Sequence, residues 1–314
     1  VFNIDSIKSA NNWVLAYYSD EQLSKLGLPA MHNRLIRENN LKGYDLEGAS
    51  LQEANFWKTN LQETNLRKAN LRGANLGKAN LHDARLDRAN LQGANLQGAN
   101  LQGANLEGAH LDRANLQDAT LLLASLLEVH LVESNLGRAN LEGSNLEGAN
   151  LHKANLWKAN LEGANLQGAS LEESNIEGAN FKGASFDIVN LKSASNWVLA
   201  YYSEDILNNL GLPAMHNTLI PKNNLRGYNF EGANLEGANL RKAKLEEANL
   251  QGANLVRANF HKADLRKANL ERANLQGASL EKANLAGARF VETNMTGVNL
   301  AGAELTEANL EGAN

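Results

Sequence analysis

The sequence predicts an all-β solenoid whose chain turns a corner every five residues. Every fifth residue is Leu, Ile or Phe from Leu41 to Leu191, and Leu, Phe or Met from Leu225 to Leu310. The residue two positions before each of these central residues is small, nearly always Ala. A helix would spread this period around its circumference, and a strand would place it on both faces. We therefore expect the central and small residues to line one interior and the other three positions to face water.

The rare residues follow the same frame. Glycine gathers two residues after the central position, where a corner with positive φ would favour it. Lys, Arg and Glu share that position, so we do not expect every corner to require glycine. All seven phenylalanines fall on central positions, as a single roomy, buried site would demand: Phe2, Phe56, Phe181, Phe186, Phe230, Phe260 and Phe290.

A typical repeat reads Ala94-Asn95-Leu96-Gln97-Gly98. This pattern resembles the A(N/D)LXX signature of the pentapeptide repeat proteins, over about four fifths of the chain. The resemblance implies a right-handed quadrilateral β-helix with four pentapeptides per coil, each coil stacked on the next at about 4.8 Å. Because it is long and carries Trp/Tyr-containing inserts, the chain resembles the pentapeptide repeat proteins that are abundant in cyanobacteria.

Two segments break the frame, and they are copies of each other. Residues 7–50 realign on residues 191–234, and both copies carry Trp, a Tyr pair and Pro. We expect each copy to form a short helical excursion, with Ser203 at the helix start of the second, anchored on the coil by Trp13 and Tyr17 or by Trp197 and Tyr201. A structural plug and a recognition element both stay open, as does whether the second copy bulges from one rod or separates two.

These features predict the organisation of the chain. In order, we expect the end of a preceding tract (1–10), a helical insert or cap (11–40), a first repeat tract (41–192), the duplicated insert (193–224) and a second tract (225–314). The pattern is cut at both Val1 and Asn314, so we expect a preceding tract at the start, and further chain or a second copy covering the last coil.

The sequence contains few candidate catalytic residues. Cysteine is absent, which excludes disulfides and thiolate sites, and we find no HExxH, phosphate loop or Ser-His-acid spacing. His110 and His130 would stack in one column, where a metal site is conceivable and two solvated histidines are the preferred interpretation. We therefore predict a non-enzyme with no catalytic, cofactor-binding or metal-binding residue and no small-molecule substrate.

The charges are balanced along the chain. The first tract carries 18 acidic and 14 basic residues and the second carries 11 of each. This composition argues against the dominant negative field that a DNA-mimicking gyrase inhibitor or protector needs, which we keep as the alternative function. The column Lys242, Lys262, Lys282 lacks interleaved aromatics, so we expect no nucleic acid partner. No apolar run approaches a membrane span, and the cytoplasm is the default location, although a preceding leader stays open.

Some apolar side chains are placed outside by the frame. They are Leu122, Leu123, Leu127 and Val132 around one coil, and Trp57 and Trp157, which four repeats per coil would place five coils apart on one side. Exposed apolar patches usually mark contact surfaces, although drift in a tolerant repeat is an alternative. The sequence thus predicts a rigid scaffold that binds a protein partner or a second copy.

Overall fold

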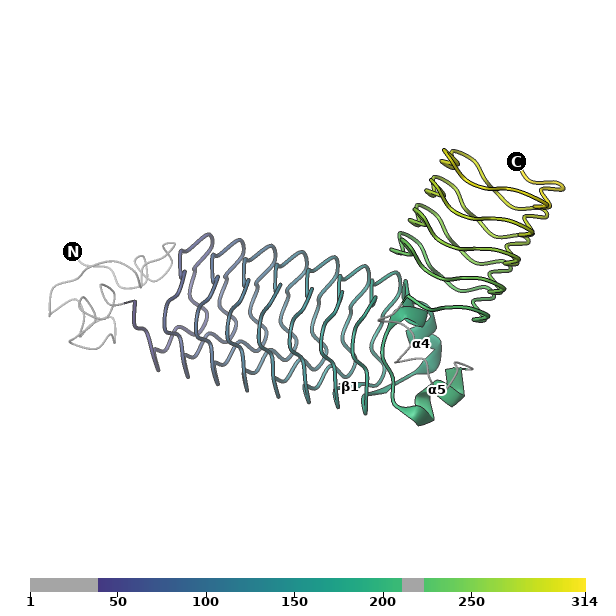
Figure 1. Cartoon of the computed structure of the whole chain (residues 1–314). Coiled ribbons are helices and arrows are strands. Elements are labelled where there is room, and N and C mark those ends of the chain that lie inside the picture. The colour runs from purple at the N-terminus through teal and green to yellow at the C-terminus, as the bar shows by residue number, and fades with distance from the viewer. Residues whose placement is uncertain (1–38, 211–222) are drawn as a thin grey trace, which may run out of the picture. The chain divides into compact units, whose positions relative to one another are not determined.

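The structure, a computed structural model, describes residues 39–210 and 223–314 (Figure 1). They belong to two compact units, the first comprising 39–174 and 180–190 and the second comprising 175–179, 191–210 and 223–314. Stacked coils make up most of each unit (Figure 1). The anchors Trp13 and Tyr17 lie outside the described residues, as do the segments 1–10 and most of 11–40.

Each coil contains four pentapeptides. The residue before each central position forms a parallel bridge with the residue twenty positions later, as Asn55 does with Asn75 and Asn75 with Asn95. Within residues 39–210 and 223–314, only one such pairing extends to two residues, where β1 (Asn165–Leu166) lies parallel to β2 (Ser185–Phe186). A twenty-residue return of a five-residue repeat gives four pairing faces, so the predicted β-helix is confirmed.

The interior consists of the leucine and alanine columns that the period predicts. Leu96 and Ala94 are both fully buried, and the same holds for nearly every equivalent residue. Burial of one leucine side chain contributes about 2 kcal/mol, so each coil adds a similar increment of stability. Two tyrosines are exceptions to the rule of small residues, since Tyr44 and Tyr228 occupy that position in the first described coil of their tracts and are buried there.

The asparagine column is a feature that the sequence frame did not predict. These side chains are half-buried rather than simply hydrated. The Asn95 Nδ2 donates to Asn75 Oδ1 at 3.2 Å, and its own Oδ1 accepts from the Gln97 backbone N–H at 3.2 Å. Asparagine therefore links neighbouring coils and also closes its own corner, which explains why it is the commonest residue at this position.

All corners of the two described tracts adopt positive φ, and the corners without glycine do so as well. The second corner residue is left-handed at Gly93, with φ of 66°, and equally at Lys68 and Leu123, with φ of 55° and 56°. Non-glycine residues pay a steric cost in this region. The coil geometry therefore dictates the backbone, and the side chain at each corner must tolerate it.

The insert begins earlier than predicted. Helix α4 (Ile188–Lys192) replaces the last pentapeptide of the tract that was expected to run to 192, although Leu191 is still buried. A 3-10 helix, η2 (Trp197–Leu199), and helix α5 (Glu204–Leu210) follow. The predicted helix after Ser203 is confirmed, and the Leu207 N–H donates to the Ser203 carbonyl at 3.0 Å.

The insert also continues the hydrogen bonding of the coils within the second unit. Ser195 pairs in parallel with Asn175, and the Tyr201 N–H donates to the Ala179 carbonyl at 2.8 Å. On its other side, the Asn196 N–H donates to the Asn234 carbonyl at 2.8 Å. This stretch of the insert is therefore built into the ladder and does not merely rest on it.

Candidate interaction surfaces

The outward residues of the coil lie at its corners. Each corner holds two side chains, directly after the central residue, and the fixed backbone hydrogen bonds of the ladder set their direction. For example, the Leu123 N–H donates to the Glu142 carbonyl at 3.0 Å. Corner residues twenty positions apart therefore stack in columns, and the sequence can be read directly as a surface.

The predicted apolar patch lies around one coil but occupies three of its corners. Leu122 and Leu123 share the first corner, Leu127 lies at the second and Val132 at the third, because their neighbours Thr120, Ser125 and His130 belong to three different ladders. Leu123 is 63% exposed, whereas Leu122, Leu127 and Val132 are half-buried. The four residues form a belt with a single prominent side chain.

Leu123 owes its exposure to the corner that it occupies. Its side chain extends over Gly143 on the next coil, where a Cβ atom would lie 2.8 Å from the Leu123 Cδ2. Gly103 precedes it in the same column. With glycine on both sides, Leu123 protrudes from the surface without packed neighbours that could cover it.

The two tryptophans occupy one corner column, as predicted. The bridges run without a break from Asn55 to Asn155, so Trp57 and Trp157 lie five coils apart on the same corner. Trp57 is 39% exposed and covers Gly77 of the next coil, leaving no space for a Cβ atom there. The Lys158 ammonium lies 4.4 Å from the centroid of the Trp157 ring, a cation–π distance.

The anchor of the second insert is partly different from the one predicted. Trp197 is buried as expected, and the Lys192 ammonium lies 5.5 Å from its ring. Of the tyrosine pair, however, Tyr202 is fully buried and Tyr201 is only half-buried. The Tyr202 hydroxyl donates to the Trp197 carbonyl at 2.6 Å, so Tyr202 and not Tyr201 ties the insert together. Burial raises the pKa of Tyr202 well above its ordinary value.

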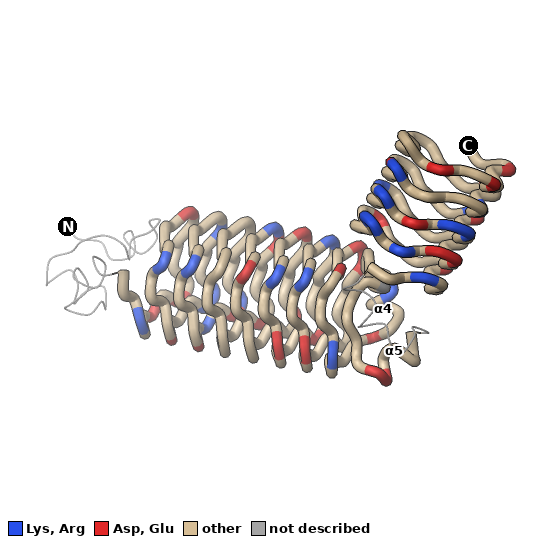
Figure 2. The backbone as a smooth tube through the Cα atoms, viewed as in Figure 1, with Lys and Arg blue, Asp and Glu red and all other residues tan. Residues whose placement is uncertain are grey.

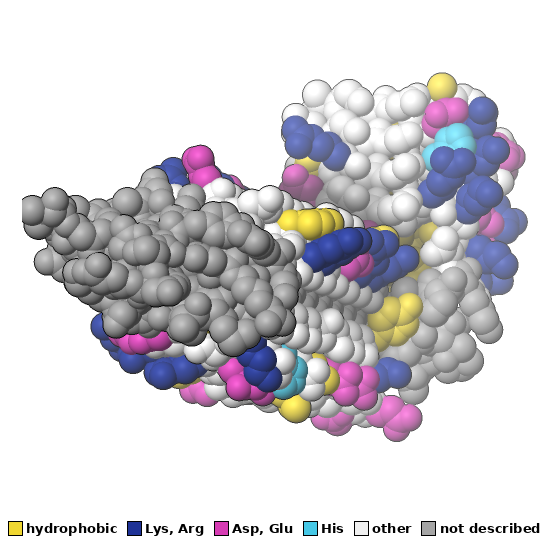
Figure 3. Space-filling view, turned by 90° about the vertical axis from the view of Figure 1, so that its left-hand side faces the viewer, with side chains coloured by type: hydrophobic (Ala, Val, Ile, Leu, Met, Phe, Trp, Pro, Cys, Tyr) yellow, Lys and Arg dark blue, Asp and Glu magenta, His cyan; other side chains and the backbone are white. Residues whose placement is uncertain are grey.

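Charged residues of both signs are interspersed over the coils (Figure 2). Many pair between neighbouring coils, as Arg138 does with Asp118 at 2.7 Å, and this hydrogen bond lowers the pKa of the Asp118 carboxyl. Within a single coil, Arg266 also donates to the Asp264 carboxylate at 2.8 Å, and this hydrogen bond lowers the pKa of Asp264. Basic side chains are grouped on part of the second unit (Figure 3). By their ladder hydrogen bonds, Lys242, Lys262 and Lys282 stack in one corner column of that unit.

Across the described residues, no helix has the length and apolar character that spanning a membrane requires. Among curated protein sequences, none matches this chain. Solved structures resemble it as well, and three of them, all with low TM-scores, illustrate the likeness. HetL, a pentapeptide repeat protein involved in heterocyst differentiation regulation in the cyanobacterium Nostoc, is 28% identical, with coverage of 89% of this chain and 93% of HetL and a TM-score of 0.35.

The second is a pentapeptide repeat protein of the Arabidopsis thaliana thylakoid lumen, 34% identical, with coverage of 34% of this chain and 74% of that protein and a TM-score of 0.33. The third is QnrB1, a plasmid-mediated fluoroquinolone resistance protein, 16% identical, with coverage of 55% and 96% and a TM-score of 0.23. The family profile described as pentapeptide repeats (8 copies) matches in overlapping segments that together span 37–192 and 224–314. With that match over both tracts, and with four such repeats in every coil, the chain belongs to the pentapeptide repeat family.

Proposed function

We propose that this protein is a non-catalytic scaffold, whose corner residues bind a protein partner or a second copy of the chain. The interior is filled by leucine and alanine, and successive coils are tied by backbone and asparagine hydrogen bonds. Such a body presents side chains at fixed spacings and is convex, which suits recognition of another surface better than enclosure of a small substrate.

One observation carries the proposal, namely the state of Leu123. This side chain is 63% exposed and its backbone has φ of 56°. A leucine in this position gains little from burial and bears the steric cost of the left-handed conformation, so it contributes nothing evident to the stability of the isolated chain. Contact with a partner would bury it.

The tryptophan column supports the same conclusion. Trp57 and Trp157 face one side at a separation of five coils, about 24 Å at the spacing of stacked strands. Tryptophan is enriched among the residues that dominate binding energy at protein interfaces. A partner that spans several coils could engage both rings at once.

A gyrase assay can distinguish the scaffold proposal from the alternative function, DNA mimicry. Acidic and basic residues are nearly balanced in the first tract and equal in number in the second, so we expect no inhibition of gyrase supercoiling at micromolar protein. Inhibition at that concentration would replace the scaffold proposal with DNA mimicry.

The decisive test uses Leu123→Glu and Leu127→Glu, because glutamate already occupies equivalent corners such as Glu128. We expect unchanged circular dichroism and loss of self-association in sedimentation velocity, or loss of a specifically captured partner. Gln102→Glu, which adds the same charge to the corner one coil earlier, is the matched control and should retain binding. Equal association by wild type and both leucine variants would remove this belt as the binding surface.

A further inference from the structure

Two histidines occupy consecutive rungs of a ladder that is otherwise mostly asparagine. His110 and His130 form a parallel bridge with each other, and each also pairs onward, with Asn90 and Asn150 respectively. Their ring centroids are 4.6 Å apart and their planes are inclined by 35°. Both side chains are exposed. The backbone therefore holds two imidazoles side by side on adjacent coils, as the sequence period predicts.

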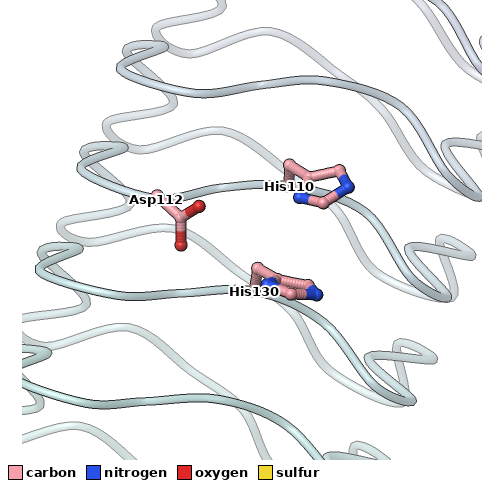
Figure 4. Close-up of side chains that lie close together, drawn as sticks. All are labelled: His110, Asp112 and His130. Atoms are coloured by element: carbon pink, nitrogen blue, oxygen red, sulfur yellow. The ribbon is translucent and has the colours of Figure 1, made fainter.

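Asp112 is the third member of this cluster, which sequence reasoning missed. It lies at the corner that directly follows His110, and each imidazole turns one ring nitrogen towards the side on which the carboxylate lies (Figure 4). One donor atom from each of the three residues lies within 4.8 Å of the others. Two nitrogens and a carboxylate oxygen thus converge on one point that is open to water.

A backbone hydrogen bond fixes the carboxylate. In an ordinary coil the asparagine Oδ1 accepts the N–H two residues later, but His130 has no oxygen for this role. The Val132 N–H instead donates to the Asp112 Oδ1 of the preceding coil at 3.0 Å. The substitution of histidine for asparagine therefore recruits Asp112, and a fixed outer contact of this kind orients a metal ligand.

Nearby cations do not neutralise Asp112. The adjacent Arg113 reaches the next coil and donates to Glu133 at 2.8 Å, which lowers the pKa of Glu133. Among the described residues, none forms an ion pair with Asp112 within 4.0 Å. Its negative charge remains available to a bound cation.

We propose that His110, His130 and Asp112 bind a divalent transition-metal ion of the zinc class. Two imidazoles and one carboxylate form a donor set that suits Zn²⁺, whereas Mg²⁺ and Ca²⁺ prefer oxygen ligands alone. Bonds of about 2.0–2.1 Å place neighbouring ligand atoms about 3.4 Å apart, so binding draws the exposed side chains slightly together. Water completes the coordination, and the ion clamps two successive coils.

The other described histidines offer smaller donor sets. His82 lies 3.0 Å from Asp83, His152 lies 3.7 Å from Glu172, and His261 lies 3.5 Å from Glu281. Each of these combines one imidazole with one carboxylate, so each should bind zinc more weakly than the three-residue cluster. They provide internal controls on the same surface.

The test is isothermal titration of the full chain with Zn²⁺ alone, with Mg²⁺ as the comparison ion. The variants are His110→Asn, His130→Asn and Asp112→Gln. Asparagine restores the usual rung, and glutamine is the residue at position 92 of the same corner, so these variants should fold. We expect each to weaken one zinc site at least about tenfold, and His152→Gln to leave that site unchanged.

A second readout is the zinc-induced rise in the thermal unfolding midpoint, expected for wild type and lost in His110→Asn. The assignment would be overturned if wild type showed no saturable zinc site, if His110→Asn and His130→Asn bound zinc as tightly as wild type, or if His152→Gln caused an equal loss. Equal affinity for Mg²⁺ would likewise overturn it.

Discussion

The left-handed corners make a quantitative prediction that can be tested at Lys68. This exposed residue has φ of 55°, and the adjacent Arg67 is the residue that pairs with Asp87, at 2.6 Å. A non-glycine residue in this region costs about 1–2 kcal/mol. Glycine removes that cost but loses about 0.5–1 kcal/mol through the greater freedom of the unfolded chain. Lys68→Gly should therefore stabilise the protein by about 0.5–1 kcal/mol.

Lys68→Ala is the matched control, because alanine deletes the same charge and keeps the strained backbone. We expect its stability to lie within about 0.5 kcal/mol of wild type. Gly93→Ala is the converse, since its φ is 66° and a Cβ atom there would meet nothing within 4 Å, so only the backbone cost appears. This variant should be less stable by about 0.5–1 kcal/mol.

The assay is urea unfolding followed by circular dichroism, with differences taken from midpoint shifts at a common slope. The slope must be compared across the series, because long repeat arrays can lose all-or-none unfolding. If Lys68→Gly were no more stable than Lys68→Ala, the positive φ at these corners would carry no cost. The proposed role of Leu123 would then rest on its exposure alone.

Three further outcomes follow from the interior, the tryptophan corner and the insert. Leu96→Lys should destabilise by several kcal/mol because it buries an unpaired charge, whereas Gln97→Lys at the exposed corner should be nearly silent, as urea unfolding would show. Gly77→Ala should displace the Trp57 ring and shift its fluorescence to longer wavelength, and an unchanged spectrum would contradict the contact. Burial raises the pKa of Tyr202 well above 10.0, so the folded state keeps its proton while the unfolded state ionises, and stability should fall as the pH rises beyond about 10. Tyr202→Phe should reduce this alkaline loss in urea midpoints compared between about pH 8 and about pH 11, and an identical loss would contradict it.

The sequence predicted the interior well because a strict period leaves no freedom in assigning faces. Every described tract leucine before the last coil lies where the frame placed it, and the column of Trp57 and Trp157 follows from the same arithmetic. The positive φ of the corners was not predictable from composition. Lys and Glu are common at these positions, and neither residue type by itself indicates a left-handed backbone. Only the hydrogen bonding of the coil shows that these residues are forced into positive φ.

Features without a period were predicted less well. Trp197 could be identified as an anchor from its size, but no regularity distinguished Tyr201 from Tyr202, and the buried member is the second. Asp112 was missed for a different reason. Its role depends on a backbone N–H of the following coil that lacks its usual acceptor, which becomes visible only when the two coils are placed side by side.

The twenty-residue return acts as a ruler for any change in chain length. Inserting or deleting a whole coil slides every later surface residue along the axis by one step and preserves its phase, so Trp157 would stay in line with Trp57. Removing a single pentapeptide between Trp57 and Trp157 instead rotates all later residues by a quarter of a turn about the coil axis. The two rings would then lie on different sides, while the hydrophobic column would stay intact. Insertions and deletions of whole repeats can thus change the spacing or the orientation of surface residues in this molecule while the packing of its interior stays nearly the same.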